Sequence, residues 1–456
     1  VNHVDKDLPQ AAWDYIKSER FWGLCLDKSY GGCGFSHLAH SAIVSKIASC
    51  SISAAYTVMV PNSLGPAELI LHAGTNEQKE IYLPKLAVGD EIGCFGLTSI
   101  EAGSDAANIP DNGVVCYSAV NGQKVLGIRV NFDKRYITLA PVATLIGLAF
   151  QLFDPDGLLG NKPNLGITVG LVHANQSGVS IGRRHSPMSL GFMNGPIQGK
   201  DVFIPMDEVI GGQARCGSGW QILMECLSVG RAISMPALAS AEGRQCFIMT
   251  GAYARIRRQF HRSVSDFEGV QEPLARIGGL SYIIEAARYF TVQPVVQGLR
   301  PTVASAICKY HLTEMSRIIL KDAMDIHCGQ ALQAGPSNIL AEMFSGVPIS
   351  TVGEGANIMT RNLIIFGQGV VRSHQFLRDE ITAARTPDDK VSQVKFDRAL
   401  LSHVGFLLSE VTRGVTSGLT GGLSYTAGEY GVLQPYLTQL NRLSNALVIF
   451  SDITLV

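Results

Sequence analysis

Residues 114–132 read VVCYSAVNGQKVLGIRVNF, and their pattern sets them apart from most of the chain. Apolar residues recur with a period near two on both sides of Asn121-Gly122, a dipeptide typical of the tight turn between two antiparallel strands. The sequence further upstream and downstream instead repeats apolar residues at spacings of three and four, as amphipathic helices do. The stretch therefore predicts a β region between two helical regions.

This change of period divides the chain into four predicted regions. Helical patterns such as LPQAAWDYIKSERFW fill an N-terminal α-helical domain, and short strands such as LGITVGLVHA and KDVFIP fill a middle β domain. Long helical patterns then return as a C-terminal α-helical bundle, and linker-like TPDDKVSQ (386–393) leads into extra C-terminal helices. The predicted fold class is therefore α+β, with regions at 1–92, 93–213, 214–385 and 386–456.

One uncharged stretch, YITLAPVATLIGLAFQLF (136–153), is nearly long enough to cross a bilayer. It contains Pro141 and Gln151, and the turn-like FDPDG follows it. We therefore predict two buried strands here and no membrane-spanning helix.

Composition excludes some classes of function. The 37 basic and 38 acidic residues give a net charge of −1, which removes the electrostatic argument for a nucleic-acid partner. The ten cysteines are scattered singly, with no CxxC and no Cys/His spacing typical of zinc, so we expect reduced cysteines and no metal site. This usage predicts a cytoplasmic protein. No targeting segment can be identified at the start of the chain, and we expect the natural N-terminus to lie upstream.

Glu354 is a lone carboxylate between two glycines in STVGEGANIMTR (350–361), with apolar sequence on both sides. Asn357 is the predicted N-cap of a following helix that Gly367 would end. The helix dipole would favour the ionised carboxylate while burial would raise its pKa, and this opposition suits a general base near neutral pH. A surface Glu that merely complements the dipole fits the pattern equally well.

Three further motifs can each be interpreted as functional or as purely structural. The small residues of CFGLTSIEAGSD (94–105) would let a ligand approach the backbone, although a strand-end turn has the same composition. Arg255, Arg258 and Arg262 have the spacing of one helix face, which would suit a pyrophosphate or simply face solvent. His327 lacks a partner residue at i+4, which favours a core or capping histidine.

The chain also lacks a GxGxxG fingerprint and a complete P-loop. Nicotinamide and ATP chemistry therefore have no support from sequence motifs.

Taken in order, several motifs resemble those of the acyl-CoA dehydrogenase family: SYGGCGFS, LTSIEAGSD, KRYIT, RRQF and GEGAN. The resemblance is strongest to the long bacterial form of fatty-acid β-oxidation, through KRYITLAPVATLIGLAFQLFDPDGLLG and GANIMTRNLIIFGQG, and it extends over essentially the whole chain. Those bacterial proteins continue past Val456, so we expect a truncated helical segment at 386–456. Any membrane association would come from segments outside this chain.

The resemblance implies FAD as cofactor and a fatty acyl-CoA as substrate. Glu354 would abstract the acyl α-proton while the β-hydrogen leaves as hydride, giving trans-2-enoyl-CoA. We expect an electron-transfer flavoprotein as electron acceptor and a homodimer or homotetramer. The alternatives are an acyl-CoA oxidase that uses oxygen and a non-catalytic or DNA-binding protein of the same fold.

The resemblance also implies site residues. Some relatives carry the base just before the position of Arg231, but Gly230 stands there in this chain, which leaves Glu354 as the candidate base. The 325–329 loop would reach the FAD of a neighbouring subunit, and Cys328 replaces the first of two family glycines there. The implied cofactor-binding residues are Leu97, Thr98, Ser104, Tyr136, Thr138, Arg257, Gln259, Phe260, Asp325, Gly329 and Asn357, and the implied substrate-binding residues are Ser104, Arg231 and Gly355.

Overall fold

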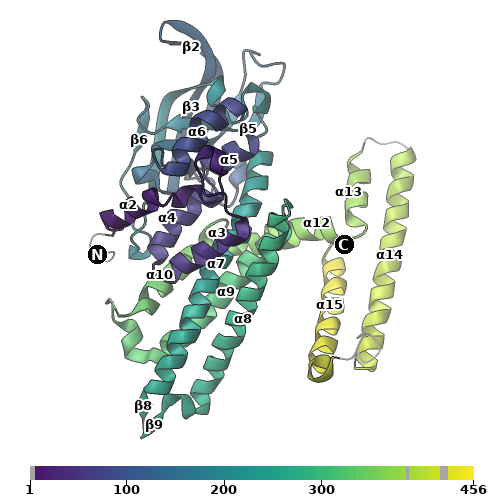
Figure 1. The fold of residues 1–456 in the computed structure, drawn as a ribbon. Helices are drawn as coiled ribbons and strands as arrows, with labels where there is room; N and C mark the ends of the chain where they lie inside the picture. The colour runs from purple at the N-terminus through teal and green to yellow at the C-terminus, as the bar shows by residue number, and fades with distance from the viewer. Residues whose placement is uncertain (1–5, 336, 387–389, 422–429, 456) are drawn as a thin grey trace. The chain divides into compact units, whose positions relative to one another are not determined.

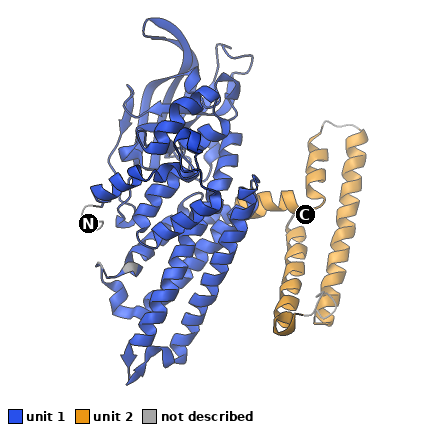
Figure 2. Cartoon of the chain, in the orientation of Figure 1, with its two compact units in different colours: residues 1–361 blue, residues 362–456 orange. Residues whose placement is uncertain are grey.

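The computed structural model describes residues 6–335, 337–386, 390–421 and 430–455. The chain forms two compact units, residues 1–361 and residues 362–456 (Figure 2). The first unit contains helices, then a sheet, then long helices, and the described part of the second unit is helical (Figure 1). The predicted α+β class is confirmed. The four predicted domain boundaries stay predictions.

Five α-helices of the described residues precede the sheet, and side-chain caps define where several of them begin. Ser36 and Ser51 each accept a backbone N–H bond at a helix N-terminus, and Thr75 forms a capping box with Gln78. Their buried faces contribute to the apolar cores of the first unit. The helices are α2 (Gln10–Ser18), α3 (His37–Ala48), α4 (Ile52–Ser63), α5 (Pro66–Ala73) and α6 (Asn76–Val88).

A seven-stranded sheet follows, in the order β1-β4-β2-β3-β7-β6, with β5 paired to β4. The predicted hairpin is confirmed: Val120 pairs with Gln123, and Asn121 and Gly122 have φ values of 50° and 78°. The prediction of two buried strands for 136–153 is only partly right. Residues 145–153 form the buried strand β4, but 136–138 are the end of β3, where Tyr136 is exposed, and a 3-10 turn (Ala140–Val142) separates the two. The strands are β1 (Gly93–Gly96), β2 (Asn112–Val120), β3 (Gln123–Thr138), β4 (Leu145–Phe153), β5 (Asn164–His173), β6 (Val179–Ile181) and β7 (Asn194–Pro205).

Long helices complete the first unit. The helix α7 packs against both α8 and α9, and the three run side by side (Figure 1). Within the described residues α7 is the one helix long and apolar enough to cross a membrane, but 83% of the qualifying window is buried inside the protein, as in a core helix. The helices are α7 (Gly219–Ile256), α8 (Glu268–Val296), α9 (Thr302–His327) and α10 (Ile339–Val352).

Two predictions about helix ends are wrong. Ala356, not Asn357, is the N-cap of α11 (Asn357–Met359). Gly367 does not end the helix, because a π-helix (Thr360–Gln368) continues into α12 (Gly369–Ser373). π-Helical segments are rare, and they are frequently found at functional sites.

The second unit contains α13 (Leu377–Arg385), α14 (Lys390–Leu419) and α15 (Gln434–Leu455). The predicted linker 386–393 is wrong from residue 390 onward, because those residues begin α14, while 387–389 lie outside the described residues. Asn445 on α15 donates to the carboxylate of Glu410 on α14 at 2.6 Å, which joins the two long helices.

Candidate active site

Glu354 lies in a sharp turn between α10 and α11. Its φ is 55°, and that of Gly355 is 97°. Left-handed backbone is common for glycine but costs a side-chain-bearing residue about 1 to 3 kcal/mol, and such residues cluster at active sites. At Gly355 an added Cβ would also come within 3.0 Å of Met359 Cε. The strained turn therefore fixes the orientation of one carboxylate side chain.

Burial and nearby polar groups have opposite effects on the carboxyl group of Glu354. Its Oε2 atom is buried and has no hydrogen-bond partner among the described residues. Burial raises the pKa of Glu354 to about 7, although the charges of Arg231 and Lys309 and a hydrogen bond from Ser234 each lower that pKa. A carboxyl group with this pKa changes between its acid and base forms near neutral pH, as a general base must.

Two buried cations hold the backbone around Glu354. Arg231 on α7 donates from Nε to the Glu354 carbonyl at 3.1 Å. Lys309 on α9, which is completely buried, donates from Nζ to the carbonyls of Thr351 and Gly355 at 3.1 and 2.7 Å. Burial lowers the pKa of Lys309 to about 7. Lys309 was not predicted as a site residue. A lysine within the mostly apolar stretch SAICKYHL (305–312) could have indicated a buried charge.

Asn357 extends this network. Its Oδ1 accepts from Lys309 at 2.7 Å, and its Nδ2 donates to Thr313 and Glu314 at 2.9 and 2.7 Å. The amide is therefore used within the chain to position the Glu354 turn. The cofactor contact expected for Asn357 stays a prediction.

Another buried cation, Lys134, anchors the loop after β1. Lys134 on β3 is completely buried, pairs with Asp111, and donates to the carbonyl of Leu97 at 2.9 Å. Burial lowers the pKa of Lys134 to about 8, against the charge of Asp111. The adjacent Arg135 donates its backbone N–H to the carbonyl of Thr98 at 2.9 Å. The loop that holds Leu97 and Thr98 is thus firmly positioned, by a pair that the sequence analysis did not find.

The end of β3 presents a surface suited to a planar cofactor. Tyr136 has a φ of 62° and leaves 67% of its surface exposed, which is unusual for an aromatic residue in a strained backbone. Asn194 donates to the Tyr136 carbonyl at 2.9 Å and to the Thr138 hydroxyl oxygen at 3.4 Å, so the Thr138 hydroxyl can still donate. Gly103 and the exposed Ser104 lie in an open loop, where a Cβ at Gly103 would meet no atom within 4 Å. These groups fit a flavin ring.

The segment between β6 and β7 joins the sheet to the Glu354 helices. The ring of His185 lies 5.4 Å from that of Tyr136, and the ring of Phe192 stacks on Tyr56 of α4 at 4.9 Å. The Tyr56 hydroxyl in turn lies 3.0 Å from the Ser350 hydroxyl on α10, one helical turn before Glu354. This segment therefore contacts Tyr136 at His185 and the helix α4 at Phe192.

The remaining candidates lie elsewhere in the first unit. The helix α7 ends at Ile256, and Arg258–Gln259 (β8) pairs with Arg262–Ser263 (β9), so the predicted helical face of Arg255, Arg258 and Arg262 is wrong. The hairpin β8–β9 lies at the end of the α7–α8 pair farthest from the sheet (Figure 1). Because a helix rises about 1.5 Å per residue, Arg257 lies roughly 40 Å along α7 from Arg231. Phe260 beside it is 84% exposed.

The end of α9 lies near the same end of α7. His327 is buried, and its ring stacks on that of Tyr253 at 4.2 Å, which confirms the prediction of a core histidine. Asp325 is in the last turn of α9, and Gly329 follows in a short 3-10 segment (Cys328–Leu332). Cys328 has a φ of 54°. The 257–260 and 325–329 candidates therefore form one group, apart from Glu354.

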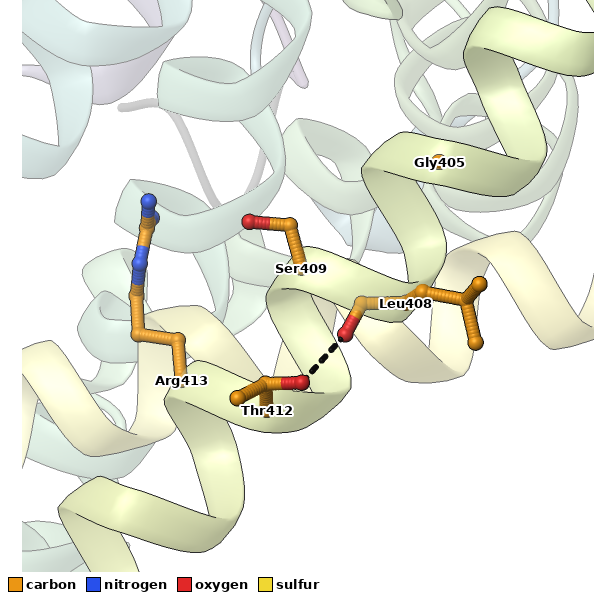
Figure 3. A pocket seen from close by; sticks show the side chains of 5 residues that line it. All are labelled: Gly405, Leu408, Ser409, Thr412 and Arg413. Carbon is orange, nitrogen blue, oxygen red and sulfur yellow. Dashed lines mark hydrogen bonds between the residues drawn. The ribbon is translucent and has the colours of Figure 1, made fainter.

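The second unit contains a shallow depression of about 420 Å³ on α14, lined by Gly405, Leu408, Ser409, Thr412 and Arg413 (Figure 3). All five residues follow one face of a single helix, and Thr412 bonds back to the Leu408 carbonyl at 2.8 Å. None of the sequence-predicted site residues lines this depression.

Family models match most of the chain. They are acyl-CoA dehydrogenase, N-terminal domain (residues 2–90), acyl-CoA dehydrogenase, C-terminal domain (217–367), and acyl-CoA dehydrogenase, C-terminal, bacterial type (371–456).

Individual proteins are also similar to this chain. Protein HemX of Proteus mirabilis is 48% identical over 104 residues, 23% of this chain and 61% of that protein. The probable acyl-CoA dehydrogenase FadE10 of Mycobacterium tuberculosis is 25% identical over 433 residues, 93% of this chain and 63% of that protein. The crystal structure of an acyl-CoA dehydrogenase from Geobacillus kaustophilus superimposes with a TM-score of 0.70 at 25% identity, covering 80% of this chain and 91% of that one. The chain thus spans less than two thirds of the length of these two curated relatives.

Proposed function

This chain belongs to the acyl-CoA dehydrogenase family, and from that membership we propose that the protein is an FAD-dependent oxidoreductase that converts fatty acyl-CoA to trans-2-enoyl-CoA. The observation that carries the proposal is Glu354. Its strained backbone, its buried and unpartnered Oε2 atom and its pKa of about 7 are the properties of a base that must accept a weakly acidic proton.

FAD would be held by Leu97, Thr98, Ser104, Tyr136 and Thr138 on the sheet side, and when bound it supplies the acceptor for the β-hydrogen as hydride. Glu354 removes the α-proton of the acyl group and holds it on its carboxylate. The backbone N–H next to Glu354 stabilises the thioester oxygen as negative charge develops there. Arg231 and Lys309 keep the turn in place and keep the base partly ionised at neutral pH.

An electron-transfer flavoprotein would then reoxidise the cofactor, and the protein would act as a homodimer or homotetramer. An acyl-CoA oxidase would share the same base and the same flavin site. Oxygen uptake in step with acyl-CoA consumption, without added flavoprotein, distinguishes the oxidase.

The test is replacement of the base, and the chain offers a matched control. Glu242 on α7 is also buried, has one carboxylate oxygen without a partner among the described residues, and has a pKa that burial raises to about 8. Glu354→Gln should slow flavin bleaching by a saturated acyl-CoA by about 10² to 10⁴-fold. Glu242→Gln should leave the bleaching rate near that of the wild type.

Stopped-flow absorbance of the FAD-loaded proteins measures both rates, and FAD content and acyl-CoA binding check that each variant is intact. Fast bleaching in Glu354→Gln would show that Glu354 is not the base, and fast bleaching in Glu354→Gln together with its loss in an intact Glu242→Gln would assign the base to Glu242.

A further inference from the structure

Three side chains that commonly bind metals converge in the N-terminal helices, outside the candidate active site. The potential ligand atoms of Cys25, His37 and His40 all lie within 4.8 Å of one another. Cys25 follows the 3-10 turn Phe21–Gly23, and the two histidines lie three residues apart in the first turns of α3, on one helix face.

The geometry of the first pair suits a tetrahedral metal ion. The Sγ atom of Cys25 lies 3.7 Å from the Nδ1 atom of His37. Around a tetrahedral zinc ion, bond lengths of about 2.3 Å to sulfur and 2.0 Å to nitrogen place these two atoms about 3.5 Å apart. The two ligands would therefore need almost no rearrangement.

The surroundings of the His40 ring are a second, independent indication that a metal ion binds here. Its side chain is completely buried, and neither ring nitrogen has a hydrogen-bond partner among the described residues. A neutral imidazole offers one donor and one acceptor, and leaving such groups unpaired in the interior costs about 1 to 3 kcal/mol each.

We propose that Cys25, His37 and His40 bind a thiophilic divalent transition-metal ion, with Zn²⁺ as the first candidate. One sulfur and two imidazole nitrogens are ligands that zinc prefers, and water would take the fourth position. The metal would connect the segment around Cys25 to the start of α3.

The second unit contains another cluster of candidate ligands, which differs in two ways. His374 accepts backbone N–H bonds from Phe376 and Leu377 on Nδ1, so its Nε2 carries the proton that it donates to Asp452. That nitrogen is not free to bind a metal. The cluster also includes His403 but no sulfur, so a metal bound there would lack a thiolate spectrum.

The experiment titrates Co²⁺ into the FAD-containing protein after treatment with a chelator. We expect one equivalent with a thiolate-to-cobalt charge-transfer band, which Zn²⁺ then removes. Cys25→Ser should abolish the band, and His40→Gln should weaken Co²⁺ binding at least about tenfold. Cys33→Ser changes a cysteine of the same segment that is outside the cluster, and it should leave the band unchanged.

A second readout does not depend on how the variants fold. Zn²⁺ should protect Cys25 of the wild-type protein from alkylation, while the exposed Cys50 reacts as before. Absence of the charge-transfer band in the wild type, its persistence in Cys25→Ser, or equal alkylation of Cys25 with and without Zn²⁺ would each overturn the proposal. None of these measurements uses acyl-CoA turnover, so they are independent of the proposed function.

Discussion

At the scale of single residues, the chemistry of Glu354 depends on two opposing effects. Burial raises the pKa of the carboxyl group, while the positive charges of Arg231 and Lys309 lower it, and the net result is a pKa of about 7. Lys309 also bonds to the carbonyls on both sides of the turn, so one side chain influences both the acidity and the position of the base.

Replacing Lys309 by Gln should therefore change the pH dependence of flavin reduction. The rate should rise with pH as Glu354 loses its proton, with a midpoint near 7 in the wild type. Removing the neighbouring positive charge favours the protonated acid, so the midpoint should move up by roughly one pH unit. Stopped-flow reduction by acyl-CoA between pH 5.5 and 9 measures this shift.

Lys321→Gln is the control for this shift, because Lys321 is an exposed lysine on the same helix. An unchanged or lower midpoint in Lys309→Gln, with bleaching retained, would show that Lys309 does not control the ionisation of Glu354.

At the scale of secondary-structure elements, the ends of helices carry the candidate cofactor residues. The helix α9 ends with His327, and the next residue, Cys328, has φ 54° and ψ −134°, a conformation that strongly favours glycine. The resemblance to the family places a glycine here. These backbone angles indicate that a cysteine strains this turn.

Replacing Cys328 by Gly should relieve that strain. The gain in stability should be about 1 to 3 kcal/mol, and FAD should bind more tightly if the 325–329 loop contacts it. Thermal unfolding with and without excess FAD, together with FAD titration, measures both effects.

Cys50→Gly serves as the control, because Cys50 is exposed and is not among the residues with positive φ. That substitution should give no stabilisation. If Cys328→Gly is no more stable than the wild type, the cysteine is accommodated without strain, and if stability rises without tighter FAD binding, the loop does not contact the cofactor.

At the scale of the whole molecule, the candidate FAD residues form two separate groups. Tyr136 and Thr138 lie on the sheet, whereas Arg257 and Phe260 lie at the far tip of the α7–α8 pair (Figure 1). The length of α7 between Arg231 and Arg257, roughly 40 Å, separates the tip from the neighbourhood of Glu354. We therefore expect each complete FAD site to combine the sheet of one subunit with the tip of another.

Mixing two defective variants tests this expectation. A sheet variant (Thr98→Ala with Thr138→Ala) and a tip variant (Arg257→Ala with Phe260→Ala) should each lose FAD when made alone. In mixed oligomers some sites pair an intact sheet with an intact tip, so co-expression should restore part of the bound FAD. The FAD content of the purified mixture measures this, and a content no higher than the mean of the two variants would place each site within one subunit.

The sequence by itself determined the order of helices and strands, because periodicity of two or three to four residues is a local property of the chain. The Asn121-Gly122 turn was predictable for the same reason, since those two residues tolerate the positive φ that the hairpin requires. Glu354 was recognisable because a lone carboxylate in apolar sequence is costly to bury without a role.

Only the tertiary structure decided which distant residues meet. The Asn357 side chain accepts a hydrogen bond from the buried Lys309, so its oxygen is not used to cap the helix, and the predicted cap was wrong. The pairing of Lys134 with Asp111, and the convergence of Cys25 with His40, likewise depend on how separate elements pack. A buried polar group must find its partners in three dimensions, and sequence spacing does not record those partners when they lie on different elements.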